Sequence, residues 1–301
     1  MTFLNKSPLI LLFVIFSGIV LSSCKAQKIQ SADFTPEFSF TKGIEGPAVD
    51  LDGNLYAVNF KEEGSIGIVS ENGEGSIFLK LPGKSIGNGI RFDSDGTMYI
   101  ADYVGHNVYQ LKKGTTTPIV WAHNPEMSQP NDLAISPNGT IYLSDPNWKE
   151  STGRIWMVTK SQEIILLEEG MGTTNGIEVS PDGTKLYVNE SVQRNIWQYD
   201  INNDGSLSNK TKFFAFDEFG MDGMRCDAMG NLYIARYDKG TVVIMTPEGK
   251  FLNEVQLKGK KPSNITFGGK NGMTCFVTMA DRGCFESFPA LFAGAFYTRT
   301  H

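Results

Sequence analysis

Six copies of one short pattern run through this 301-residue chain and constrain its fold more than any other feature. In each copy a polar residue opens a short run of strand-forming residues and lies eight positions before a glycine, after which a second such run follows. The leading polar residues are Glu45, Asn88, Asn131, Asn175, Asp222 and Asn264. The glycines are Gly53, Gly96, Gly139, Gly183, Gly230 and Gly272, so successive copies are 43, 43, 44, 47 and 42 residues apart. A pattern that recurs at this period predicts one supersecondary unit per copy, with each unit packed on its neighbours.

The residues around each glycine predict a tight hairpin between two strands. Asp or Asn precedes the glycine in every copy except the fifth, where Met229 does. These residue types adopt the positive φ of hairpin turns at low cost. Two further strand patterns follow each hairpin, for example at 107–111 and 117–121. Four antiparallel strands in each of six copies predict an all-β fold, a six-bladed β-propeller.

The last copy has three strand patterns, which end near residues 284–288, and it lacks a clear fourth. The segment 34–40 lies before the first copy, where an outer strand is needed. We therefore expect an N-terminal strand to complete the sixth blade and close the propeller, because closure removes exposed strand edges. The propeller is expected to span residues 34–301.

The N-terminus predicts a secretory signal. Lys6 is followed by an apolar run over residues 8–21 and then by Leu21-Ser-Ser-Cys24, which resembles a bacterial lipobox. This pattern predicts a signal peptide at 1–23, a lipid on Cys24 and a short tether at 24–33. A plain signal peptide with an incidental cysteine is the alternative. The protein would then face the periplasm and contact the membrane only through this lipid. The residue after Cys24 is Lys25 and not an acidic retention signal, which favours the outer membrane.

The charge balance argues against nucleic acid as a partner. The chain has 27 Lys and Arg against 33 Asp and Glu, for a net charge of −6, and its basic residues are not clustered. Three cysteines follow the predicted lipidation site, at Cys226, Cys275 and Cys284. Cys275 and Cys284 can either pair across neighbouring strands or remain free in the core.

The six leading residues are expected to meet at one end of the central channel. The innermost strands of a propeller line its channel, so residues of equal phase form a ring around the axis. Two carboxylates, from Glu45 and Asp222, with four amides and no His or Cys, favour a hard cation, and calcium accepts such oxygen ligands more loosely than magnesium. Each Asn could instead support its own turn. That alternative does not account for two like charges at the same phase, which would repel each other unless a cation lay between them.

Several blade signatures resemble the senescence marker protein (regucalcin) and gluconolactonase family of calcium-dependent six-bladed propellers. These signatures are Glu45-Gly-Pro, Asn175-Gly with Ser180-Pro-Asp-Gly183, and Met221-Asp-Gly-Met224. The resemblance implies that Glu45, Asn175 and Asp222 hold the metal. It also implies that Asn131 contacts the substrate or a metal-bound water. Asn88, from the same ring of leading residues, is a further candidate substrate contact. Sugar-lactonase relatives often carry an Arg two residues before that Asn, whereas Gln129 stands here.

The same resemblance implies a calcium-dependent hydrolase that opens lactones, foremost those of sugar acids. Asp222 is the candidate catalytic residue, either activating a water or attacking directly. From the loops at the same mouth, Tyr103, Trp148 and Arg236 are expected to contact the substrate, although Tyr103 and Trp148 could be packed loop anchors. His106 and His123 are candidate proton shuttles, or simply solvated residues. The alternative functions are a phosphotriesterase or aryl esterase at the same metal, and a non-catalytic propeller that contains calcium and binds a ligand or protein.

Overall fold

The computed structural model describes residues 1–2 and 29–301, which include all six copies of the repeat. Apart from Met1 and Thr2, the predicted signal peptide lies outside the described residues, as does Cys24. In the part of the chain that the structure describes, no helix has the length and apolar character needed to cross a membrane.

Six four-stranded antiparallel sheets form the molecule, and each sheet corresponds to one copy of the repeat. The first blade contains β2 (Phe40–Val49), β3 (Leu55–Phe60), β4 (Ser65–Val69) and β5 (Gly75–Lys80). The second contains β6 (Gly87–Phe92), β7 (Met98–Asp102), β8 (Asn107–Leu111) and β9 (Ile119–His123). The third contains β10 (Leu133–Ile135), β11 (Ile141–Asn147), β12 (Thr152–Val158) and β13 (Ile164–Met171).

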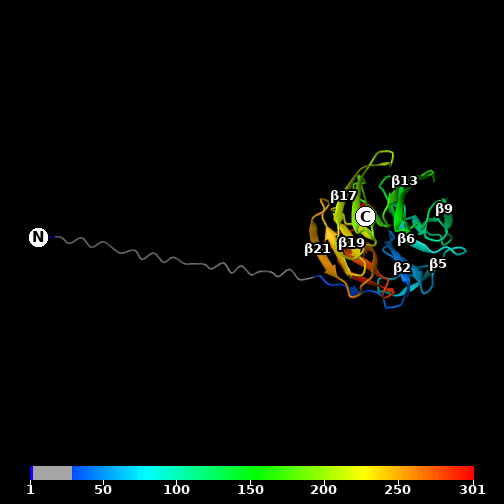
Figure 1. Cartoon of the computed structure of the whole chain (residues 1–301). Coiled ribbons are helices and arrows are strands. Elements are labelled where there is room, and N and C mark those ends of the chain that lie inside the picture. Colours follow the sequence, from blue (N-terminus) through cyan, green and yellow to red (C-terminus); the bar gives the residue numbers. More distant parts are fainter. Residues whose placement is uncertain (3–28) are drawn as a thin grey trace.

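The fourth blade contains β14 (Thr174–Val179), β15 (Lys185–Glu190), β16 (Asn195–Ile201) and β17 (Leu207–Ala215). The fifth contains β18 (Met224–Cys226), β19 (Leu232–Arg236), β20 (Thr241–Met245) and β21 (Phe251–Gln256). The sixth contains β22 (Pro262–Gly268), β23 (Thr274–Met279), β24 (Cys284–Pro289) and β1 (Ala32–Asp33). A short 3-10 helix, η1 (Lys270–Gly272), forms the turn between β22 and β23. The colours run once around the ring, so the six-bladed propeller predicted from the repeat is confirmed (Figure 1).

An N-terminal strand closes the ring, as the missing fourth strand of the last copy predicted. β1 pairs with β24, with Ala32 opposite Ser287. This strand begins before the expected boundary at residue 34, and the chain after it continues along the same edge. There the Phe38 amide donates to the Arg282 carbonyl at 2.9 Å, and the Phe40 amide donates to the Gly283 carbonyl at 2.9 Å. The first and sixth blades are therefore joined through the backbone.

Apolar side chains fill the space between neighbouring blades, because each inner and middle strand buries side chains on both faces. Between the first and second blades, Val58, Ile66, Ile90 and Ile100 are completely buried in one cluster. Blades pack face to face in this way all around the axis, which explains why the strands lack a simple alternation of apolar and polar residues.

The three cysteines in the described part of the chain form no disulfide. Cys226, Cys275 and Cys284 are free and buried. Cys275 lies opposite Phe288 and Cys284 opposite Met279, so the two are not cross-strand partners. Of the two alternatives for Cys275 and Cys284, the structure therefore has the free thiols.

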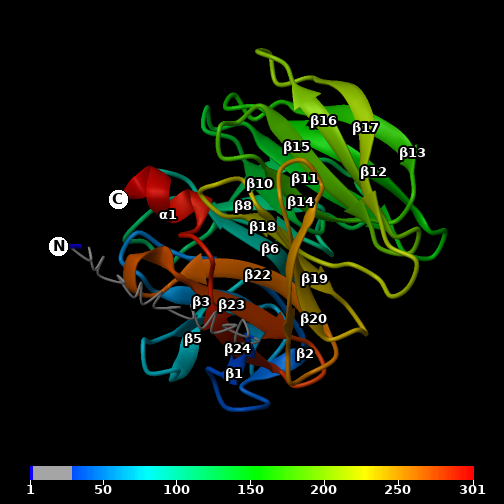
Figure 2. The same ribbon diagram turned by 90° about the vertical axis from the view of Figure 1, so that its left-hand side faces the viewer.

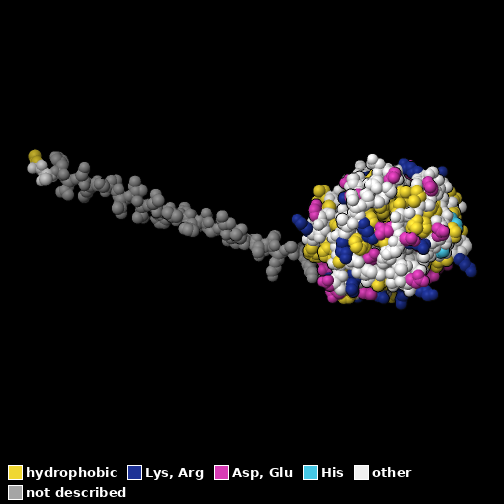
Figure 3. All heavy atoms as spheres, turned by 45° about the horizontal axis from the view of Figure 1, so that its top comes forward, with side chains coloured by type: hydrophobic (Ala, Val, Ile, Leu, Met, Phe, Trp, Pro, Cys, Tyr) yellow, Lys and Arg dark blue, Asp and Glu magenta, His cyan; other side chains and the backbone are white. Residues whose placement is uncertain are grey.

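A C-terminal helix, α1 (Ala295–Thr300), covers one end of the channel (Figure 2). Ala295 packs into the cluster between the fourth and fifth blades, and Phe296 packs against the cluster between the first two blades. A bridge between Asp227 and Gly294 ties the segment before α1 to the fifth blade. The repeat carried no signal for this helix, because it lies beyond the last copy. On the face shown in Figure 3, acidic and basic side chains are interspersed with hydrophobic ones.

Candidate functional site

The other end of the channel opens into a pocket of about 390 Å³, which we call the central pocket. Five of the six leading residues of the repeat line it, namely Glu45, Asn88, Asn131, Asn175 and Asp222. In the sixth blade Ser263 lines the pocket instead of its neighbour Asn264. Tyr103, Trp148 and Tyr237 reach the same pocket from surrounding loops. Residues at the same position of five copies of the repeat thus lie together at the channel mouth.

Glycines after the leading residues allow the inner strands to approach closely at the axis. A Cβ on Gly46, which has φ 57°, would lie 2.0 Å from the Asn88 carbonyl oxygen. A Cβ on Gly223 would lie 1.9 Å from Oδ1 of Asn264. A side chain at either position would force the strands apart and widen the pocket. In the third blade this position holds Asp132, whose side chain lies at the axis beneath the pocket.

Two carboxylates, from the buried Glu45 and the partly buried Asp222, lie next to each other at the base of the pocket. Burial, and after it the charge of Asp132, raises the pKa of Glu45 to about 7. Burial and the neighbouring Glu45 carboxylate raise the pKa of Asp222 well above its usual range. The Glu45 carboxylate thus disfavours the ionised form of Asp222, and a bound cation would remove this penalty.

Asn175 supplies a third oxygen. Its Nδ2 donates to Oγ of Ser191 at 3.0 Å, and that hydroxyl in turn donates to the Met221 carbonyl. The amide is thereby fixed with Oδ1 free, and this buried atom has no hydrogen-bond partner among the described residues. An unpaired buried acceptor beside two carboxylates fits a hard cation, because oxygen is the ligand type that calcium prefers. Within the described chain no three His, Cys, Asp or Glu side chains form a metal-binding group, so such a site depends on the amide.

The raised pKa of Glu45 has a consequence for the metal-free protein. A folded state that holds a proton more tightly than the unfolded state loses stability as the pH rises. Between pH 4.5 and about 7, the pKa shift of Glu45 should therefore lower the free energy of unfolding, by about 3 kcal/mol in total. Thermal melts of metal-free protein across this range should show the decrease.

The matched control for this pH dependence is Glu45→Gln, which cannot titrate. Its melting temperature should vary less with pH than that of the parent. In saturating calcium the trend of the parent should reverse, because cation binding needs deprotonated carboxylates and strengthens as the pH rises. An equal slope in Glu45→Gln and the parent would contradict this account.

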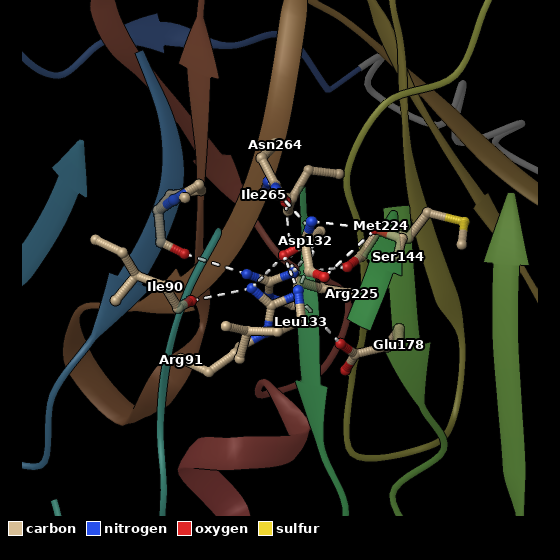
Figure 4. Close-up of polar contacts among 12 residues, drawn as sticks. Ile90, Arg91, Asp132, Leu133, Ser144, Glu178, Met224, Arg225, Asn264 and Ile265 are labelled. Carbon is tan, nitrogen blue, oxygen red and sulfur yellow. Dashed lines mark hydrogen bonds and ion pairs between the residues drawn. The ribbon is translucent and has the colours of Figure 1, made fainter. Parts of the chain in front are cut away.

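Beneath the pocket a buried ion network fills the channel (Figure 4). It consists of Arg91, Asp132, Glu178 and Arg225, and we call it the channel network. Nη1 of Arg91 lies 2.9 Å from Oδ1 of Asp132, and Nη1 of Arg225 lies 3.6 Å from Oδ2. Nη2 of Arg91 also lies 3.8 Å from Oε2 of Glu178. Two positive and two negative charges balance, which permits their burial.

The channel network is connected to the site through Asn264. Its Nδ2 lies 3.0 Å from Oε2 of Glu45 and 3.3 Å from Oδ2 of Asp132, and donates to both. Its Oδ1 accepts from the Ile265 amide at 2.8 Å. Asn264 therefore points into the channel and orients Glu45, whereas the other leading residues line the pocket. On the far side of the network, Arg91, Glu178 and Arg225 and residues of α1 together line a cavity of about 60 Å³.

The leading residues of the repeat do not reveal the channel network, although a later position of the repeat contains a signal for it. Arg91, Glu178 and Arg225 each lie three positions after a leading residue, where the other copies have Ala48, Ala134 and Phe267. Charged residues at a position that is otherwise apolar mark the channel wall. Comparing the copies beyond their first residue would have found them.

Tyr103 and Trp148, both expected to contact substrate, line the central pocket. Gln129 links them, since its Nε2 donates to the Tyr103 hydroxyl at 2.6 Å and its Oε1 accepts from the Trp148 amide at 3.4 Å. The residue that replaces the arginine of sugar-lactonase relatives thus holds two loops of the pocket wall together.

The structure does not bring Arg236, His106 or His123 to the pocket. Arg236 is only 2% exposed and its guanidinium lies 3.4 Å over the ring of Phe216, so it does not reach a substrate. His123 is exposed, and its Nδ1 lies 2.9 Å from Oδ1 of Asn107 on the neighbouring strand. His106 lies in the turn before β8, with φ 55°. These positions support neither the substrate contact predicted for Arg236 nor the proton shuttles predicted for the histidines.

Buried polar residues at or near the ends of the second strands hold the loops at the mouth. Asp102 accepts from the Gly105 amide at 2.9 Å and from Nδ2 of Asn107 at 2.7 Å. Asp145 accepts from the Gln129 amide at 2.6 Å and from Nε1 of Trp156 at 2.9 Å. In the fifth blade Arg236 likewise holds a loop, by donating hydrogen bonds to the backbone carbonyls of Glu218 and Gly220. The sequence predicts that Arg236 lies at the mouth, but the inward direction of its side chain depends on loop conformations that periodicity does not determine.

Comparisons with known proteins agree with this architecture. The family model described as "SMP-30/Gluconolactonase/LRE-like region" matches residues 42–281. The chain belongs to this family. The resemblance drawn from the blade signatures is therefore confirmed.

Among curated relatives, a gluconolactonase from Zymomonas mobilis is 30% identical over 216 residues, which cover 64% of this chain and 60% of that protein. A pentonolactonase, XacC, from Haloferax volcanii is 26% identical over 153 residues, covering 50% of this chain and 53% of the relative. The chain thus spans between half and two thirds of the length of these relatives. Among solved structures, a calcium-binding protein, regucalcin, from Agrobacterium tumefaciens has a TM-score of 0.76 at 21% identity. That match covers 89% of this chain and 98% of the other, and it shows that the fold is shared.

Proposed function

We propose that this member of the family hydrolyses lactones at a calcium ion held by Glu45, Asn175 and Asp222. The observation that carries the proposal is the base of the central pocket. There, two adjoining carboxylates with raised pKa values lie beside a buried amide oxygen that has no partner among the described residues. The relatives named gluconolactonase and pentonolactonase support lactones as the substrate class.

The donor set favours calcium over softer metals, because it offers carboxylate and amide oxygens and no His or Cys. When bound, the cation supplies Lewis-acid polarisation of a lactone carbonyl. The central pocket, at about 390 Å³, has the volume of a small-molecule site. The amides of Asn88 and Asn131 line it and can donate hydrogen bonds to lactone oxygens.

The chain's own residues account for the proton transfers. Asp222 accepts the proton of a water that attacks the carbonyl carbon, because a cation beside it would keep its carboxylate ionised and able to act as a base. The ring C–O bond then breaks, and the leaving alkoxide oxygen takes up the proton that Asp222 accepted, which gives a hydroxy acid and restores the Asp222 carboxylate. Tyr237, whose pKa burial raises to about 12, lines the pocket as a neutral phenol at working pH.

A substrate panel tests the proposal. Soluble protein beginning at Ser31, with saturating calcium, should open lactone rings. An aryl ester and a phosphotriester, assayed alongside, should react more slowly. Progress is followed by proton release in weakly buffered solution. Calcium binding without turnover of any lactone would contradict the proposal and favour a propeller that only binds ligands.

A further inference from the structure

A second cavity, of about 470 Å³, adjoins the central pocket, and we call it the side groove. It shares Trp148, Asn175, Asp222 and Tyr237 with the central pocket. The two cavities therefore meet at two of the three proposed metal-binding residues. A molecule that reacts at Asp222 can extend into the side groove without leaving the site.

The side groove has an apolar wall. Val192, Phe219 and Met221 line it together with Trp148, while Ser191, Arg194 and Asp238 supply the polar part of its lining. Val192 is 53% exposed, Phe219 40% and Trp148 39%, so large apolar groups face an open cavity instead of the core. Apolar side chains that gather in a concave surface mark a place where an apolar ligand is buried.

The position of Phe219 is enforced by the surrounding structure. Its backbone has φ 55°, a left-handed conformation that costs free energy for an aromatic residue. Arg236 holds this loop, donating from Nη2 to the Glu218 carbonyl at 2.5 Å and from Nε to the Gly220 carbonyl at 3.4 Å. Because Arg236 is itself buried against Phe216, the groove wall is formed before any ligand arrives.

The opposite side of the central pocket has a different character. Lys42, Asn59, Glu63 and Asn88 line it there and are absent from the side groove. Hydroxyl groups of a sugar would find partners on this polar side, but they would lose hydrogen bonds to water against Val192 and Phe219. The two sides of the site thus discriminate between polar and apolar parts of a substrate.

We propose that the side groove binds the alkyl substituent of a lactone, so that the preferred substrates are alkyl-substituted lactones and not polyhydroxylated ones. This inference rests on the proposed lactone hydrolysis and specifies its substrate class. The lactone ring lies at Asp222, and its chain runs along Val192 and Phe219. Each methylene buried there should raise kcat/KM by about three- to fourfold until the groove is filled.

The experiment measures kcat/KM for γ-lactones whose unbranched alkyl chain is lengthened stepwise, with glucono-δ-lactone as the polar comparison. The variants Val192→Ser and Phe219→Asn remove the apolar wall, and Asn tolerates the left-handed conformation at 219. The matched control is Val104→Ser, since Val104 is another exposed valine, at 44%, and lines neither cavity. In both groove variants the ratio of long-chain to unsubstituted lactone rates should fall at least tenfold, while the control keeps the parental ratio.

Two results would overturn the inference. One is turnover of glucono-δ-lactone with no gain from longer alkyl chains, which would leave the proposed hydrolysis intact. The other is a gain that survives unchanged in both groove variants, which would place the chain elsewhere. If no lactone of either kind is opened, the proposed function itself fails, and the inference fails with it.

Discussion

Asp222→Asn should reduce kcat for lactone opening by at least about 100-fold, because the amide cannot accept the proton of the attacking water. The fold should survive, since the substitution keeps the shape of the side chain and removes one of two mutually repelling carboxylates. For the same reason, the metal-free variant should melt at a higher temperature than the metal-free parent at pH 7.5. Initial rates and thermal melts of both proteins test these expectations.

The matched control for Asp222→Asn is Asp52→Asn, which changes an exposed hairpin carboxylate that pairs with Lys113 at 3.0 Å. This variant should keep parental rates. If Asp222→Asn retains turnover within a few-fold of the parent, Asp222 is not the residue that activates water. The base of the pocket would then need a different assignment.

Asp132→Ala should destabilise the protein by about 3–5 kcal/mol, because it leaves the buried guanidinium of Arg91 without its closest counter-charge. Asp132 is completely buried, and Arg225 lies near it as well. The free energy of unfolding from chemical denaturation measures this effect.

Two further variants test whether the loss of stability in Asp132→Ala comes from the buried charge. Asp52→Ala breaks an exposed ion pair and should cost less than about 1 kcal/mol. Asp132→Asn keeps the volume but removes the charge, so it should also be strongly destabilising if charge balance is what matters. A loss below 1 kcal/mol for both Asp132 variants would show that the channel network does not stabilise the fold.

The repeat predicted the fold well because its period and its turn residues act locally. Six copies of a hairpin with further strands leave few architectures other than a closed propeller. The missing fourth strand of the last copy also predicted closure by the N-terminus, now seen as the pairing of β1 with β24. The repeat also predicted that the leading residues meet, and five of them line one pocket. Residues at the same position of each copy lie at the same depth in the channel.

The rest of the site depended on side-chain direction and loop conformation, which the repeat does not determine. Arg236 follows a strand that ends at the mouth, yet its guanidinium turns inward to loop carbonyls. Phe219 forms the side groove only because its backbone adopts an uncommon conformation. The helix α1 lies outside the repeat altogether, so no comparison between copies could predict it.

The most direct test of the central claim is the initial rate of lactone opening as a function of free calcium, measured on the same sample as a calcium-binding isotherm. We expect one calcium bound per chain at this site, no turnover without calcium, and a rate that rises in proportion to the occupancy of the site. Full activity in protein stripped of divalent cations, or a rate that does not follow occupancy, would contradict a calcium-dependent hydrolase built on Glu45, Asn175 and Asp222.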